Sequence, residues 1–298
     1  MKLVVSIIYL LSASLAGATP LTPKTKSSSS TVLTGSQKVF KNASTHFDRV
    51  VYIVFENQQY KEVVLNSTFK ELMKKGTSFT QFFGETHPSQ PNYIAMIAGD
   101  TLGVQTDSNV SLDGKHLGDL LEDKGMNWAV YAEDYPGHCF LEESRGYYAR
   151  KHVPFLSFKN VEQNKARCSN VKNLLEFDKD WKAHQLPTFS MIIPNNFNNG
   201  HDTDIKTTAN WINQYLKRYI DDQNFLKQTL VVLTYDEDDY QSTNQVFTLL
   251  LGSAVKGDYL NHEKHNHYSL LKLMEEEWQL GSLNRNDKTA APISNLWK

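Results

Sequence analysis

The chain has 298 residues, of which 40% are hydrophobic and 21% are charged. This length is enough for one large α/β domain or two small ones, and the composition is that of an ordinary globular protein. The formal net charge of −2 gives no electrostatic basis for a nucleic-acid partner, which we therefore exclude.

The N-terminus has the features of a secretory signal peptide. Lys2 supplies the positive start, residues 3–15 form an apolar stretch, and Ala16-Gly-Ala18 is a small-residue cleavage site. The alternative is a membrane anchor, but the apolar run is shorter than the ~20 residues that span a bilayer. We expect residues 1–18 to be removed, with no stable membrane insertion.

Residues 19–46 are predicted to be a disordered leader rich in Ser and Thr, and residues 47–298 to form the folded domain. Three Asn-X-Ser/Thr sequons begin at Asn42, Asn66 and Asn109, and they predict glycosylation. The expected location is therefore extracellular; free secretion and retention in a cell wall are both open.

Strand candidates alternate with helical segments along the rest of the chain. We expect strands at residues 50–55, 78–83, 128–132, 188–193, 229–235 and 246–251. Helices are expected at 67–75, from 93 onward, at 116–124, 205–220 and 268–278, with a loop-rich insertion at 136–170. This alternation predicts an α/β fold with a mostly parallel sheet and helices on both faces.

Carboxylates follow two of the apolar strands. Glu56 and Asn57 come after residues 50–55, and Asp236 and Glu237 after residues 229–235. The carboxyl ends of parallel strands share one edge of a sheet, so these groups are expected to meet and repel. A divalent cation would remove that repulsion. The alternative is that Asp236–Asp239 is an acidic surface loop.

Ser89 lies between a predicted strand and an apolar helix. Pro91 suits the first turn of a helix, which places Ser89 near the helix N-terminus. Free N–H groups and the helix dipole there favour a phosphate-like anion. A plain N-cap serine is the alternative.

Several of the ten histidines lie in the candidate loops. His201 follows a loop rich in Asn and Gly directly after a strand, which favours a functional role over a structural one. His267 begins the last helix. Arg150-Lys-His152 places three cations or donors in a row, which suits the binding of an anionic substrate. The alternative is that these residues form a solvated turn.

Cys139 and Cys168 are the two cysteines. In an oxidising compartment such a pair usually forms a disulfide, and a loop of about 30 residues would stabilise the fold by ~3–4 kcal/mol. Two free buried thiols are the alternative.

Six motifs in order make the chain resemble the secreted fungal acid phosphatases of the phosphoesterase family, which also includes bacterial acid phosphatases and phospholipase C enzymes and has an alkaline phosphatase-like fold. The resemblance covers roughly residues 49–280. The motifs begin at Val54, Thr86, Arg150, Pro194, Thr234 and His267.

The resemblance implies a role for particular residues. Glu56, Asn57, Asp236 and Glu237 match metal ligands, Ser89 matches the hydroxyl nucleophile, and Asn92 matches an oxyanion contact. His152 and His201 match groups that contact the phosphoryl group or protonate the leaving group. Asn195 and Glu237 depart from the ligands of a second zinc site, so one divalent ion is expected, with Asp202 and His267 as reserve ligands.

The predicted function is that of a metal-dependent acid phosphatase, which hydrolyses small phosphate monoesters through a phosphoserine intermediate. One alternative is a phospholipase C or another phosphodiesterase. The alternative of another class is a non-catalytic secreted glycoprotein on the same scaffold. The sequence leaves the natural substrate, the identity of the metal and the oligomeric state open.

Overall fold

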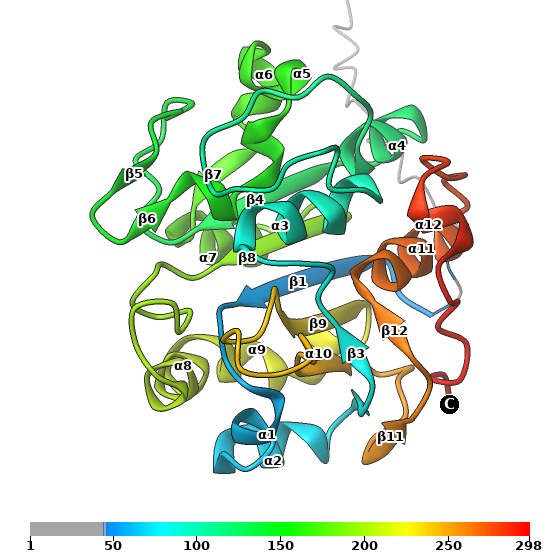
Figure 1. Cartoon of the computed structure of the whole chain (residues 1–298). Helices are drawn as coiled ribbons and strands as arrows, with labels where there is room; N and C mark the ends of the chain where they lie inside the picture. Colours follow the sequence, from blue (N-terminus) through cyan, green and yellow to red (C-terminus); the bar gives the residue numbers. More distant parts are fainter. Residues whose placement is uncertain (1–43, 45) are drawn as a thin grey trace, which may run out of the picture. The chain divides into compact units, whose positions relative to one another are not determined.

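The centre of the structure is an eight-stranded sheet in the order β11-β2-β10-β9-β1-β8-β4-β7 (Figure 1). The computed structural model describes residue 44 and residues 46–298. Strand β10 is antiparallel to both of its neighbours, and the other pairs in this sheet are parallel. The strands are β1 (Arg49–Phe55), β2 (Thr77–Phe79), β4 (Trp128–Ala132), β7 (Val171–Asn173), β8 (Phe189–Ile193), β9 (Thr229–Tyr235), β10 (Thr248–Leu251) and β11 (Tyr259–Asn261).

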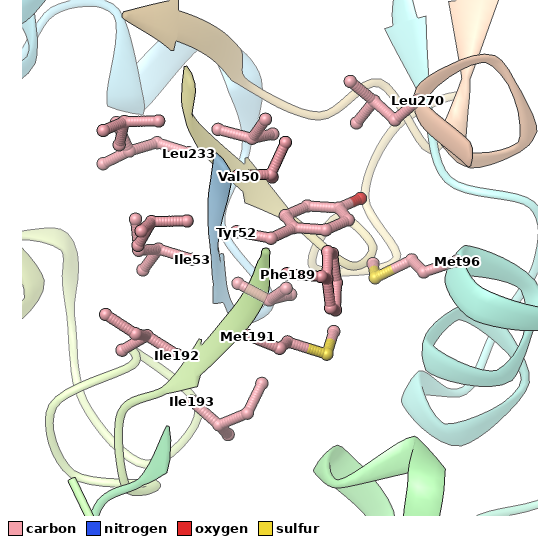
Figure 2. Close-up of a cluster of buried hydrophobic side chains, with 14 of the residues drawn as sticks. Val50, Tyr52, Ile53, Met96, Phe189, Met191, Ile192, Ile193, Leu233 and Leu270 are labelled. Atoms are coloured by element: carbon pink, nitrogen blue, oxygen red, sulfur yellow. The ribbon is translucent and has the colours of Figure 1, made fainter. Parts of the chain in front are cut away.

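The central strands are buried along their whole length. Every residue of β4, β8, β9 and β10 is buried, as is all of β1 after Arg49. Such strands are continuous apolar runs because helices cover both faces of the sheet. Figure 2 shows Tyr52 and Met191 pointing toward Met96 and Leu270, whereas Ile53 points to the opposite side.

The helices fall into two groups by their contacts. Helix α3 (Ser89–Ala98) packs against α11 (His267–Glu277) and α4 (Leu117–Asp123), and against the 3₁₀ segments η1 (Arg150–His152) and η2 (Pro154–Ser157). Helices α7, α9 and α10 share an aromatic cluster that includes Phe177, Tyr219 and Phe225. Their bounds, with the neighbouring helices, are α7 (Leu175–Lys182), α8 (Ile205–Trp211), the π-helical turn η3 (Ile212–Leu216), α9 (Lys217–Ile220) and α10 (Gln223–Leu226).

The remaining elements are short. They are α1 (Tyr60–Val63), α2 (Ser67–Met73), α5 (Lys159–Glu162), α6 (Lys165–Cys168), α12 (Asn286–Thr289), and the pairs β3 (Phe82–Phe83) with β12 (His265–Asn266) and β5 (Ser144–Arg145) with β6 (Tyr148–Ala149). Within the described part of the chain, no helix has the length and apolar character needed to cross a bilayer.

The predicted fold class is confirmed, and the differences are local. Residues 78–83 were expected to form one strand but form β2 and β3, which belong to different sheets. The helix expected from residue 93 begins earlier, at Ser89. The segment at 205–220 is helical, with a π turn inside it. Within the loop-rich insertion, Cys139 and Cys168 form a disulfide with a Cα–Cα distance of 5.6 Å.

Residues 1–18, Asn42 and nearly all of the predicted leader lie outside the described residues, so the predicted signal peptide and domain boundaries stay predictions. Of the other two sequons, Asn109 is exposed. Asn66 is half-buried, and its side chain accepts a hydrogen bond from Thr68 N as the N-cap of α2.

Candidate active site

Two acidic strand ends meet at the centre of the sheet. Strands β1 and β9 are adjacent and parallel, with Phe55 opposite Tyr235, so the residues that follow both strands lie side by side. The backbone confirms this, because Asp236 N donates to Phe55 O at 3.0 Å. The side chains of Glu56, Asp236 and Glu237 are all buried.

Ser89 lies between two of these carboxyl groups. It is the first residue of α3 and is 1% exposed. Its Oγ is 3.0 Å from Glu56 Oε2 and 3.0 Å from Glu237 Oε1. The hydroxyl proton can be donated to only one of them at a time. The helix N-terminus is also partly capped, since Gln90 N donates to Asp107 Oδ1 at 2.9 Å.

The three acidic side chains raise one another's pKa. Burial, followed by the charge of Asp236, raises the pKa of Glu56 well above its usual range. Burial and the neighbouring Glu237 do the same to Asp236. Burial and the charge of Glu56 raise the pKa of Glu237 to about 8. The three shifts share one cause: several carboxylates lie close together and are shielded from water, which disfavours the ionised form of each.

These oxygens fit a divalent cation. Neither carboxylate oxygen of Asp236 has a hydrogen bond of ordinary geometry, although Ser89 and the Glu237 backbone lie close enough to act on its pKa. A buried charged group held so weakly is costly unless something else satisfies it. One heavy atom of the Asn57 amide lies 3.3 Å from Glu56 Oε2 and 3.3 Å from Glu237 Oε1. As nitrogen this atom donates to both carboxylates, and as oxygen it adds an amide oxygen to the carboxylate oxygens of the group.

A second group of possible ligands shares Glu56. The ligand atoms of Glu56, His152 and His201 all lie within 4.8 Å of one another. His152 Nε2 is 3.1 Å from Glu56 Oε1. Burial and the nearby charge of Lys151 hold the pKa of His152 well below its usual range, so this imidazole is neutral. The structure thus places both predicted histidines beside the predicted carboxylates.

Of the three predicted basic residues in a row, two face this site. Lys151 Nζ is 2.7 Å from Asp107 Oδ2 and 3.2 Å from His201 Nε2. Arg150 instead donates to the backbone oxygens of Leu141, Val110 and Leu156, and pairs with Glu162 at 3.4 Å. It therefore stabilises the insertion.

The reserve ligands have other partners. His267 Nε2 lies 2.7 Å from the backbone oxygen of Asp236. This buried ring therefore holds the backbone just after β9 in place. Burial lowers the pKa of His267 to about 4, and the ring is neutral. Asp202 Oδ1 is 2.7 Å from His201 Nδ1, which is the position of a group that orients an imidazole.

The side-chain amide of Asn92 forms hydrogen bonds with the backbone of the loop before Ser89. Its Oδ1 accepts from Glu85 N and Thr86 N, and its Nδ2 donates to Thr86 O and Pro88 O. The predicted contact with a substrate oxygen stays a prediction, but in this structure the amide fixes the approach of the chain to Ser89. Another ring in this loop, His87, lies with its Nδ1 2.6 Å from Glu237 Oε2.

Two site residues were missed by the sequence reasoning. Tyr93 Oη donates to Glu56 Oε1 at 2.6 Å, and its i, i+4 spacing from Ser89 on one helix could have identified it. Asp107 bridges Lys151 and the start of α3. No sequence motif marks Asp107. Its side chain reaches the site only because the loop after α3 folds back toward the start of that helix.

Known proteins resemble this chain over most of its length. The model of the Phosphoesterase family matches residues 18–281. The phosphate-repressible acid phosphatase of Penicillium chrysogenum is 36% identical over 257 residues, which are 81% of this chain and 61% of that protein. The phosphatidylinositol-3-phosphatase of Mycobacterium tuberculosis is 34% identical over 259 residues, 84% of this chain and 83% of that protein.

The solved structures show the fold. A Vibrio parahaemolyticus protein of the alkaline phosphatase superfamily aligns with a TM-score of 0.56 at 12% identity, covering 85% of this chain and 72% of its own. The present chain spans about three fifths of the length of the fungal acid phosphatases that it matches.

Proposed function

The chain belongs to the Phosphoesterase family, and we propose that it is an acid phosphatase that hydrolyses phosphate monoesters through a phosphoserine on Ser89. The observation that carries the proposal is the position of the Ser89 hydroxyl, buried at the start of α3 and 3.0 Å from two carboxyl groups. The two relatives described above are both named as phosphatases, which supports a monoester substrate.

Glu56, Asn57, Asp236 and Glu237 are the residues that would hold one divalent cation. The oxygens of Asp236, which lack a hydrogen bond of ordinary geometry, favour this set, whereas Glu56 Oε1, which faces His152, already accepts a hydrogen bond from Tyr93. When bound, the cation would offset the carboxylate charge, make the serine oxygen more acidic and draw charge from the phosphoryl group.

In the first step, Ser89 Oγ attacks phosphorus while its proton passes to Glu237 Oε1. Glu237 can accept this proton only as the carboxylate, the form that a cation bound to this group of residues would favour over the protonated acid. The bond between phosphorus and the leaving oxygen breaks, and protonated His201 donates its proton to that oxygen. Asp202 holds the opposite nitrogen of the ring.

In the second step, the neutral His201 takes a proton from water, which attacks the phosphoserine. The bond from phosphorus to Ser89 Oγ breaks, and the proton on Glu237 returns to the serine oxygen. Lys151 is the cation that would bind the phosphoryl oxygens in both steps, exchanging its contact with Asp107 for the substrate. The first step uses the protonated form of His201, so Lys151 must also leave its contact with His201 Nε2, which is 3.2 Å away.

We place this enzyme outside the cell. The disulfide between Cys139 and Cys168 supports an oxidising compartment, and the predicted signal peptide and sequons fit the same location. Glycosylation at Asn109 is favoured by its exposure.

The test compares p-nitrophenyl phosphate with bis-p-nitrophenyl phosphate between about pH 4 and pH 8, before and after treatment with a chelator. Faster hydrolysis of the monoester at acidic pH, lost with the chelator and regained with added metal, is the expected result. A preference for the diester would transfer the assignment to a phospholipase C or other phosphodiesterase. Hydrolysis of neither ester, with metal supplied, would favour the non-catalytic glycoprotein.

A further inference from the structure

Three exposed aromatic side chains require an explanation. Among the described residues, the exposed large hydrophobic side chains are Tyr147, Phe197 and Tyr240, which are 51%, 44% and 57% exposed, and Leu65, Leu175 and Leu260. Single apolar residues on a surface are ordinary. The aromatic ones differ from the leucines in their placement along the chain.

Each of these three rings, here called the aromatic trio, lies in a segment that carries site residues. Tyr240 follows Asp236 and Glu237 in one loop, Phe197 precedes His201 in another, and Tyr147 precedes Lys151 and His152. The exposed leucines lie elsewhere: between α1 and α2, at the start of α7 and in β11.

Tyr240 is held firmly beside the site. Its ring stacks on His87 with centroids 4.0 Å apart and an interplanar angle of 25°, and His87 in turn contacts Glu237. The backbone is fixed by a hydrogen bond from Tyr240 N to Asp238 Oδ1 at 2.8 Å, and its φ of +65°, which is unfavourable for a bulky residue, shows that the position is imposed.

The phenol of Tyr240 lies in the field of the acidic cluster. Burial, followed by the negative charges of Glu237 and Asp107, raises its pKa to about 12. Glu237 follows β9 and Asp107 lies in the loop after α3, so two separate segments contribute this charge. The stacking on His87, which contacts Glu237, places the exposed ring beside the groups that surround Ser89.

Tyr147 and Phe197 form a pair next to the His201 loop. Their ring centroids are 5.5 Å apart. Tyr147 O accepts a hydrogen bond from Asn196 N at 2.9 Å, and Phe197 O accepts one from Thr203 Oγ1 at 2.6 Å. The pair is thus tied to the segment that positions His201, the group assigned to the leaving oxygen.

We propose that the aromatic trio binds the organic part of the substrate, and that the preferred substrates are phosphate monoesters whose alcohol carries an aromatic ring. This inference rests on the proposed phosphatase function. Flat rings are recognised by stacking, which adds to the gain from burying apolar surface. Rigid aromatic side chains provide that contact with little loss of conformational freedom.

The test compares 2-phenylethyl phosphate with ethyl phosphate, because both are esters of primary alcohols and differ mainly in the ring. The wild-type protein is expected to favour the phenylethyl ester in kcat/KM by about threefold to thirtyfold, chiefly through a lower KM. Y240A and the double variant Y147A/F197A should each reduce that ratio. Y240F, which keeps the ring, should retain it, and Y240L should not.

The control is L175A, which removes an exposed apolar side chain from α7 and should leave both rates and their ratio unchanged. A ratio in Y240A and in Y147A/F197A equal to that of the wild type would overturn the inference, as would equal hydrolysis of both esters by the wild type. If the wild type hydrolyses neither ester, the proposed phosphatase function fails and this inference fails with it.

Discussion

Ser89 is the residue on which the proposed chemistry depends, because its Oγ lies 3.0 Å from each of two buried carboxyl oxygens. S89A removes the nucleophile without removing a large side chain from the core. We expect kcat to decrease by at least about 10³-fold, with the thermal unfolding temperature nearly unchanged. Steady-state kinetics and calorimetry measure the two effects.

The control for this variant is S190A, because Ser190 is also a fully buried serine, in β8, and its hydroxyl has no hydrogen-bond partner. S190A should keep wild-type kcat. Acid quenching of the wild-type reaction should also trap a phosphoryl group on the peptide that contains Ser89. Wild-type turnover by S89A would remove the serine from the mechanism.

Lys151 is the residue that we assign to the phosphoryl oxygens. Although burial opposes its charge, the hydrogen bond to Asp107 and the negative field of Glu56 raise its pKa, so it is a fixed cation. K151M keeps approximately the length of the side chain and removes its positive charge. We expect kcat/KM to decrease by about 10²-fold and inorganic phosphate to become a weaker competitive inhibitor.

K159M is the matched control for Lys151, because Lys159 also pairs with one aspartate, Asp113 at 2.7 Å, but lies on the surface. It should retain wild-type inhibition by phosphate. An unchanged inhibition constant in K151M would show that Lys151 serves only to hold Asp107 and the start of α3.

At the scale of elements, helix α11 is joined to the segment before α12 by two buried acidic side chains. Glu275 Oε1 and Asp287 Oδ2 both accept a hydrogen bond from Leu283 N, at 3.3 Å and 2.9 Å. The start of α12 contacts the end of α3, since Asn286 N donates to Gly99 O at 2.9 Å. Gly99 has a φ of +69°, and a Cβ there would lie 2.4 Å from Asp287 Oδ1, so both its conformation and its contact require glycine.

This pair predicts a pH-dependent stability. Burial and the charge of Asp287 raise the pKa of Glu275 from 4.5 to about 8. Between these two values the folded state keeps a proton that the unfolded state has lost, so the free energy of unfolding decreases as the pH rises through this window. Because a protonated pair is the stable form, this contact favours acidic conditions.

E275Q is neutral at every pH and should be insensitive to this effect. We expect its unfolding temperature to exceed that of the wild type by several degrees near pH 8, at roughly 2–4 °C per kcal/mol, with a smaller difference near pH 5. E142Q, at an exposed glutamate away from this pair, is the control and should follow the wild type. Parallel curves for E275Q and the wild type would mean that Glu275 is ionised in the folded protein.

The elements that could be predicted from the sequence are those with a strong local pattern. Strands β1, β8 and β9 are apolar runs of five to seven residues, and helices α4 and α11 have clear apolar faces. Residues 82–83 were predicted as part of a strand, but β12 and its pairing with β3 were not predictable, because that pairing is set by where Asn266 and Glu85 bring two distant segments together. Helix α7 was missed because it has one buried residue, Phe177.

At the scale of the whole molecule, the candidate site draws on the ends of β1 and β9, the start of α3, the segment η1 and the loop after β8. The strand-end residues were predictable, since parallel strands deliver their carboxyl ends to one edge. The orientation of each side chain was not. Arg150 turns away from its two neighbours, Asn92 turns toward its own loop, and Asp107 enters from a segment with no recognisable motif.

A fold that gathers buried carboxylates from separate segments is expected to be stabilised by a cation, because the unfolded chain cannot assemble the site. At a metal concentration of about 100 times Kd the gain is about 2.7 kcal/mol, which corresponds to roughly 5–11 °C in Tm. Differential scanning calorimetry of chelator-treated protein, with and without Mg²⁺, Mn²⁺, Ca²⁺ or Zn²⁺, measures it. S89A should keep most of this response, since the carboxylates remain, whereas D236N should lose most of it. If no cation raises the Tm of the wild type, the buried carboxyl groups are neutralised by protons instead, and the raised pKa values of Glu56, Asp236 and Glu237 would then describe the site in the folded protein.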